Sequence, residues 1–248
     1  MGTSIGTLLT AFQSELAQPT KQTVKSEILN RKNELILKLL AVLEQHAADE
    51  AKIFSNESLS GQGKQQALRR LGNETAPRLK WIGNVIRDME AVDQRFKTRF
   101  FTINSGIEDP AVRMPTFTYL WSKLDTLDPN ERITRFSQAA EGNEVLVLAG
   151  MLANPLGAMV TEEVKERALI ERAKRLTPRE YENFEQNQLL LEYMTMVRDW
   201  VGRWLFGEVG VEIQPIREAL GDALANALTV QRTGIPTETD TQLAAASN

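Results

Sequence analysis

The residue types that most often carry catalysis or bind metals are nearly absent from this chain. Its 248 residues include no cysteine and one histidine, His46. The lack of cysteine excludes disulfides, thiolate zinc sites, iron–sulfur clusters and cysteine nucleophiles. A single histidine also excludes paired-histidine zinc sites and the histidine motifs of di-iron bundles. These two counts remove most metal chemistry from consideration.

A serine–histidine–acid arrangement needs only one histidine, so His46 requires its own interpretation. No Gly-x-Ser-x-Gly elbow or comparable nucleophile context occurs in the sequence. His46 lies four residues after Val42 and seven before Ile53, on the flank of an apolar helix face. We therefore expect a partly buried histidine that is hydrogen-bonded to a neighbour, and we assign it no catalytic role.

Two other patterns have ordinary structural explanations. Gly61-Gln62-Gly63-Lys64 has glycines and a lysine, as phosphate-binding loops do, but its spacing differs and no Ser or Thr follows the lysine. It therefore predicts a turn between helices. The many carboxylates of 161–199 have basic residues three or four positions away, which is typical of solvated helix faces. No pair of carboxylates is singled out, so the sequence predicts no enzyme, no cofactor and no metal site.

The most distinctive chemical feature is a basic helical segment, 64–99. The stretch 55–100 has nine basic and five acidic residues, whereas 207–248 has two basic and six acidic ones. Clustered Lys and Arg suit nucleic-acid phosphates, but they also suit the acidic C-terminal region of a neighbouring subunit. Because the whole chain has a net charge of -4, we favour the contact between subunits. Candidate contact residues are Arg69, Arg70, Arg78, Lys80 and Arg87.

Two indoles form a second candidate contact. Trp200 and Trp204 lie on neighbouring turns of one predicted helix, with Val197 and Val201 beside them. Aromatic pairs of this kind dominate interfaces when they are exposed and ordinary cores when they are buried. We expect a core position, and an interface role only if this helix edge is exposed.

Apolar residues recur at intervals of three and four, which predicts an all-α fold. Residues 23–54 form one expected long helix, 55–64 a turn and 68–100 a second long helix, which Pro77 should bend or interrupt. We expect these two helices to form a long, antiparallel, coiled-coil-like hairpin. Their apolar lines are Leu29, Ile36, Leu40, Leu43, Ala47 and Phe54, and then Leu68, Leu71, Thr75, Leu79, Ile82, Ile86, Met89, Asp93, Phe96 and Phe100, with Val92 able to turn inward beside Asp93.

Shorter helices are expected after residue 103. Asp128-Pro129-Asn130-Glu131 and Thr177-Pro178-Arg179-Glu180 have the layout of capped helix starts. The expected helices are 116–126, 130–140, 143–153, 161–176 and 178–206, followed by an extended segment at 207–213, a last helix at 215–231 and a polar, disordered tail at 233–248. The predicted domains are 1–103 (N-terminal helix and hairpin), 104–206 (compact bundle) and 207–248 (extended segment, last helix and tail).

No segment has the pattern of a secretory signal or a membrane span. Residues 1–13 lack a basic flank and have apolar residues spaced as in an amphipathic helix. The longest apolar run, Val145 to Val160, is interrupted by Gly150, Asn154, Pro155 and Gly157, and is shorter than the ~20 residues that a span requires. We therefore expect a soluble protein that has no membrane partner.

The stretch Gln65-Gln-Ala-Leu-Arg-Arg-Leu-Gly-Asn-Glu-Thr-Ala-Pro-Arg-Leu-Lys-Trp81, together with the cysteine-free, threonine-rich tail, resembles the minor structural proteins of tailed bacteriophages. The likeness is one of composition and helical patterning and extends over the whole chain. It implies a virion component, made in the host cytoplasm, such as a capsid-associated, neck or internal protein.

The resulting hypothesis is a non-enzymatic structural or assembly protein that works as a homo-oligomer or within a larger particle. Its expected partners are copies of itself or other virion or assembly proteins; outside a virion it would be cytoplasmic. The alternative is a regulatory or adaptor module that binds nucleic acid or a protein through the basic helix 64–99. A hydrolase or transferase has the least support.

Overall fold

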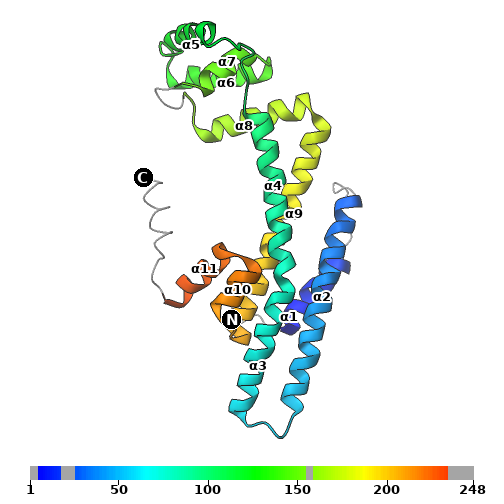
Figure 1. Cartoon of the computed structure of the whole chain (residues 1–248). Helices are drawn as coiled ribbons and strands as arrows, with labels where there is room; N and C mark the ends of the chain where they lie inside the picture. Colours follow the sequence, from blue (N-terminus) through cyan, green and yellow to red (C-terminus); the bar gives the residue numbers. More distant parts are fainter. Residues whose placement is uncertain (1–4, 18–25, 155–158, 234–248) are drawn as a thin grey trace. The chain divides into compact units, whose positions relative to one another are not determined.

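A computed structural model describes residues 5–17, 26–154 and 159–233 (Figure 1). These residues form helices and turns and include no β-strand, which confirms the predicted all-α fold. The predicted polar tail lies outside the described residues beyond Thr233. The helices are α1 Ile5–Ala17, α2 Ser26–Ser55, α3 Gly61–Thr75, α4 Lys80–Phe101, α5 Pro110–Leu124, α6 Pro129–Glu141, α7 Val145–Leu152, α8 Glu162–Leu176, α9 Pro178–Trp204, α10 Ile213–Leu220 and α11 Asp222–Thr233.

The chain divides into two compact units. Unit 1 comprises 1–90 and 188–248, and unit 2 comprises 91–187. The three predicted domains, 1–103, 104–206 and 207–248, do not coincide with these units. Both boundaries fall inside unbroken helices, α4 and α9, so no proline, glycine or loop marks them in the sequence.

Proline 77 interrupts the second long helical segment, as predicted. Helix α3 ends at Thr75, a 3-10 turn covers Ala76–Leu79, and α4 begins at Lys80. Proline lacks a backbone donor and crowds the preceding turn of an α-helix. The backbone therefore tightens here, while the Ala76 and Leu79 side chains remain fully buried.

Helices α2 and α3 pack against each other on either side of a turn (Figure 1). The turn is shorter than the predicted 55–64, because α3 begins at Gly61. The Gly63 N–H donates to Ser60 Oγ at 3.1 Å, which is the usual contact of an N-cap serine. Lys64 Nζ donates to the Phe54 carbonyl at 2.7 Å, so the lysine of the phosphate-loop-like sequence closes the turn.

The far end of this helix pair lacks a core. The buried residues of α2 end at His46 and those of α3 begin at Gly72, so 47–71 contains no buried residue. We call residues 47–71 the α2–α3 tip. Phe54, which was predicted on the apolar stripe, lies in the tip and is 55% exposed. Its expected burial was wrong because the core of unit 1 stops before this turn of α2.

The core of unit 1 combines α1, α2, α4, α9, α10 and α11. Its members are apolar, and most recur at helical spacing. Its largest fully buried side chains are Trp204, Phe12, Leu8, Ile36, Leu39, Leu43, Leu79, Ile82 and Met89.

The predicted extended segment at 207–213 is wrong. Residues Leu205–Val209 form a π-helical turn, Gly210 has a φ of 75°, and α10 begins at Ile213. A Cβ placed on Gly72 would lie 2.6 Å from Val209 Cγ1 and 2.5 Å from Val211 Cγ2. The two valines thus alternate with polar residues because they pack against α3, and not because they pair in a sheet.

The predicted last helix, 215–231, is two helices. Gly221 has a φ of 103° and separates α10 from α11. This conformation lies in the region that favours glycine, so the helix direction changes at this residue.

Substituting valine for Gly72 should lower the free energy of unfolding by about 1–3 kcal/mol, because the added carbons overlap Val209 and Val211. Alanine at Gly61, on the same helix, is the control. A Cβ there would meet nothing within 4 Å, so a change below about 1 kcal/mol is expected. Urea denaturation of both variants measures the difference. Equal midpoints for the two variants would contradict the close contact at Gly72.

Unit 2 contains α5 to α8 and has a core of its own, built around Phe136, Leu148 and Leu169. The capping box predicted at the start of α6 is present, since Asp128 accepts from the Glu131 N–H and the Glu131 carboxylate accepts from the Asp128 N–H. Helix α5 begins earlier than the predicted 116, because Asp109 caps it and Pro110 occupies its first turn. Val92 is 44% exposed and does not turn inward, and Asp93 beside it pairs with Lys97 at 3.5 Å.

Candidate interaction surface

Five cations predicted to make contacts lie exposed on unit 1. Arg69 and Arg70 belong to α3, Arg78 to the 3-10 turn, and Lys80 and Arg87 to α4. We call these five residues the basic surface. The 3-10 turn and α4 bury Leu79 and Ile82 in the core, whereas the buried residues of α3 are only Gly72 and Thr75.

Within the part of the chain that the structure describes, no residue of the basic surface forms an ion pair. Arg87 donates to Asn84 Oδ1, and Arg69 lies beside the Gly210 turn. In unit 2, by contrast, Lys97 bonds with Glu166 at 3.3 Å and Arg99 with Glu180 at 2.9 Å. The basic segment predicted at 64–99 thus has paired cations at its C-terminal end and unpaired ones in unit 1.

The acidic segment lies next to the basic one in the same chain. The π-helical turn packs on α3, and α10 packs on the 3-10 turn. Glu208, Glu212 and Glu218 are exposed, and no ion pair joins them to the basic surface among the described residues. The two segments are therefore neighbours on unit 1, each still able to contact another molecule.

The two candidate tryptophans have different environments. Trp204 is 2% exposed and belongs to the core, so it is not an interface residue. Trp200 is half-buried, and its ring centroid lies 5.9 Å from that of Phe12 on α1. The expected core position thus holds fully for Trp204 and partly for Trp200.

His46 is buried and hydrogen-bonded, as predicted. Its Nδ1 lies 2.8 Å from Thr75 Oγ1, and the Thr75 hydroxyl donates to the Leu71 carbonyl at 2.8 Å. The Thr75 oxygen therefore accepts from His46 Nδ1–H. The ring also stands edge-on to Trp204, with centroids 4.8 Å apart. This cluster joins α2, α3 and α9 in the core of unit 1.

Burial lowers the pKa of His46 from 6.5 to about 4. The Asp49 carboxylate acts in the opposite direction and Arg78 adds to the lowering. Burial penalises the charged imidazolium more than Asp49 stabilises it. His46 is thus neutral at physiological pH, and it serves as a polar link within the core. The available sequence signal for its partner was Thr75, which is one of two polar residues on that predicted apolar line.

Among the residues that the structure describes, no group of three or more His, Asp or Glu side chains could hold a metal ion. Within the same residues, no helix combines the length and the apolar character that crossing a membrane requires. No protein-family model, curated protein or solved structure matches this chain.

Proposed function

We propose that this chain is a non-enzymatic structural or assembly protein that acts by contact, as a homo-oligomer or as part of a larger particle. The supporting observation is the α2–α3 tip, where two helices pack without any buried residue. Helical pairs of this kind gain stability when another surface covers them.

The chemistry of the tip favours a protein partner with an acidic surface. Phe54 is 55% exposed there, and Arg69 and Arg70 are exposed and form no ion pair among the described residues. Aromatic residues and arginines are enriched at the energetic centres of protein interfaces. An acidic partner would neutralise the arginines while it covers the phenylalanine.

A second copy of the chain meets this description. Its exposed Glu208, Glu212 and Glu218 lie beside its own basic surface. In a contact with two-fold symmetry, the basic surface of each copy can therefore face the acidic segment of the other, so that the same pairing forms twice. We also propose that α2 and α3 pack on each other in the manner of a coiled coil.

A virion is the proposed setting for this assembly. The support is the resemblance of residues 65–81 and of the whole chain's composition to minor structural proteins of tailed bacteriophages. Capsid-associated, neck and internal positions all depend on contacts between helical surfaces, and the protein would be made in the host cytoplasm.

Reversing two charges at the tip tests the proposal. Arg69→Glu combined with Arg70→Glu is expected to weaken association by about tenfold or more, because it sets like charges against the acidic partner. Sedimentation at increasing protein concentration measures the change. The matched control, Arg31→Glu with Arg179→Glu, makes the same change of net charge at two other exposed arginines and should leave association unaltered. Equal weakening in both double variants would contradict a specific contact at the tip.

The second candidate is an adaptor that binds nucleic acid through the basic surface. Five exposed cations without carboxylate partners in the described chain favour it, whereas the net charge of -4 opposes it. Retention on DNA that declines with salt and is lost when Arg69, Arg70 and Lys80 become alanine would support this candidate. No retention at low salt would exclude it.

A further inference from the structure

A groove between α6 and α8 of unit 2 has features of a ligand site. Its volume is about 370 Å³, which lies within the usual range for small-molecule pockets, about 300–1,000 Å³. Ile133, Ala140, Val164 and Ala168 supply apolar surface. The groove lies wholly within unit 2 and is separate from the basic surface of unit 1.

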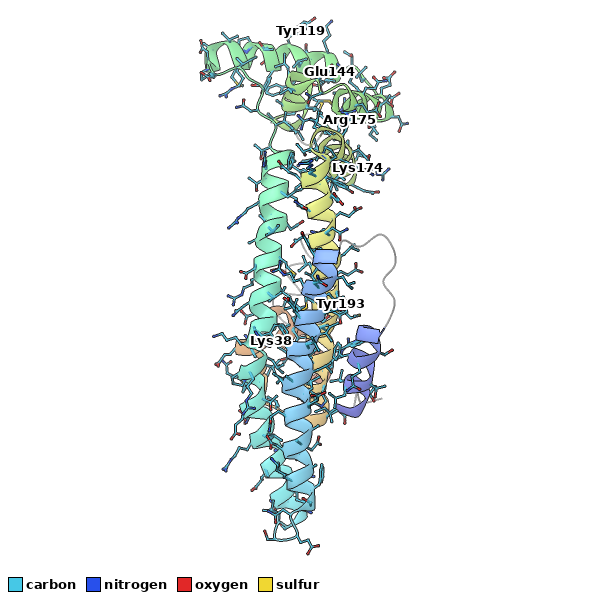
Figure 2. The ribbon with its side chains drawn as sticks, turned by 90° about the vertical axis from the view of Figure 1, so that its right-hand side faces the viewer. Lys38, Tyr119, Glu144, Lys174, Arg175 and Tyr193 are labelled. Carbon is cyan, nitrogen blue, oxygen red and sulfur yellow. The ribbon has the colours of Figure 1, made fainter. Side chains whose placement is uncertain are left out.

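Three arginines of α8 line this groove. Arg172 and Arg175 lie one turn apart on α8, Arg167 lies five residues before Arg172, and all three line the groove that α8 forms with α6. Figure 2 labels Arg175 on this helix, next to Lys174. Guanidinium groups bind carboxylates and phosphates through paired N–H donors. The three arginines outnumber the two carboxylates of the lining, Glu141 and Glu171, so the groove suits an anionic ligand.

Two of these arginines are held in place by neutral acceptors. Arg172 donates from Nε and Nη2 to Asn143 Oδ1, at 3.0 and 2.8 Å. Arg175 donates from Nη2 to the Ala140 carbonyl at 2.7 Å. A guanidinium has five N–H donors, so most donors of both groups remain after these bonds. The bonds thus fix the positions of the charges without neutralising them.

The electrostatics of the pair also suit an anion. Neither Arg172 nor Arg175 forms an ion pair with a carboxylate of the described residues. Burial lowers the pKa of Arg172, and the nearby positive charge of Arg175 lowers it further. Two like charges held close together without a counter-ion are stabilised when an anion binds between or beside them.

Arg167, the third arginine, can leave its ion pair and contact a ligand with little loss of stability. Arg167 Nη2 lies 2.7 Å from Glu163 Oε1, but these two side chains are 70% and 82% exposed. Exposed pairs of this kind contribute little to stability, so Arg167 is free to exchange its partner for a ligand.

We propose that the α6–α8 groove binds a small organic anion. Its carboxylate or phosphate group would be held by Arg172, Arg175 and Arg167, and its apolar part would cover Ile133, Val164 and Ala168. The inference is independent of the proposed assembly function, because it concerns the other unit.

Glu171 provides a sharp test of this site. It lines the groove four residues from both Arg167 and Arg175, and it forms no ion pair among the described residues. Its carboxylate opposes an incoming anion. Glu171→Gln should therefore tighten binding by about threefold to fivefold, a gain that partial unfolding could not produce.

Titration calorimetry with phenyl phosphate, benzoate and inorganic phosphate tests the proposal on the full chain. Phenyl phosphate or benzoate should bind with a stoichiometry of one and more tightly than inorganic phosphate, because only these probes have an apolar part. The tighter-binding of these two probes shows whether the groove prefers a phosphate or a carboxylate group. Arg167→Ala should weaken binding by about threefold to fivefold, since it removes one partly exposed charge contact.

Arg179→Ala is the matched control, because Arg179 is exposed in the same unit but does not line the groove. It should leave affinity unchanged. The proposal is overturned if no probe binds saturably, if inorganic phosphate binds as tightly as both organic probes, or if Arg179→Ala weakens binding as much as Arg167→Ala. Weaker or unchanged binding by the Glu171→Gln variant would also overturn it.

Discussion

Substituting alanine for Trp204 is expected to lower the free energy of unfolding by about 3–5 kcal/mol. Trp204 is 2% exposed and packs within the core of unit 1, with the His46 ring edge-on to it. Removing the indole leaves a large cavity and also deprives His46 of its aromatic neighbour. Urea denaturation followed by circular dichroism measures the loss.

Leu189→Ala, on the same helix α9, is the control for this prediction. Leu189 is 47% exposed, so its truncation should cost less than about 1 kcal/mol. If Trp204→Ala lowered the free energy of unfolding as little as Leu189→Ala, Trp204 would not be buried as described. It would then again be a candidate interface residue.

Acidification is expected to destabilise unit 1 through His46. The folded pKa is about 4 and the ordinary value is 6.5, so the unfolded chain binds a proton at higher pH than the folded one. The stabilising contribution of neutral His46 is therefore complete above pH 6.5 and is lost as pH falls from 6.5 to 4. The loss reaches at most about 3 kcal/mol.

Comparing wild type with His46→Gln isolates this contribution, because glutamine can still donate to Thr75 Oγ1 but does not titrate. The free energy of unfolding of wild type should fall more steeply over this pH interval than that of the variant. Parallel curves would contradict the lowered pKa. Asp49 and Arg78, the charged groups that act on His46, are present in both proteins and cancel in the comparison.

Features with a local physical cause could be predicted from the sequence. Pro77 changes the helix to a 3-10 turn through its own missing N–H and its ring, and the Asp128–Glu131 capping box depends on residues three positions apart. The exposure of Arg69, Arg70 and Lys80 follows likewise from their residue type, because charged side chains are rarely buried without a partner. His46 was correctly expected to be hydrogen-bonded, although its partner Thr75 was not identified.

Features that depend on distant packing could not be predicted. The valines of 207–213 alternate with polar residues as a strand would, yet Val209 and Val211 do so because Gly72 of α3 approaches them closely. The boundaries between units lie within unbroken helices, where no residue type signals them. The α6–α8 groove exists only when α6 packs against α8, so the site that its three arginines share was not apparent from the sequence.

The mass of the native protein, measured by light scattering at micromolar concentration, tests the central claim of an assembly protein most directly. One chain has a mass of 27.8 kDa. For a homo-oligomer, we expect a mass that is a multiple of this value and that decreases in the Arg69→Glu/Arg70→Glu variant. A component of a larger particle would instead migrate with that particle in its native source. A single species of 27.8 kDa, both for the purified protein at micromolar concentration and in the native source, would contradict the claim.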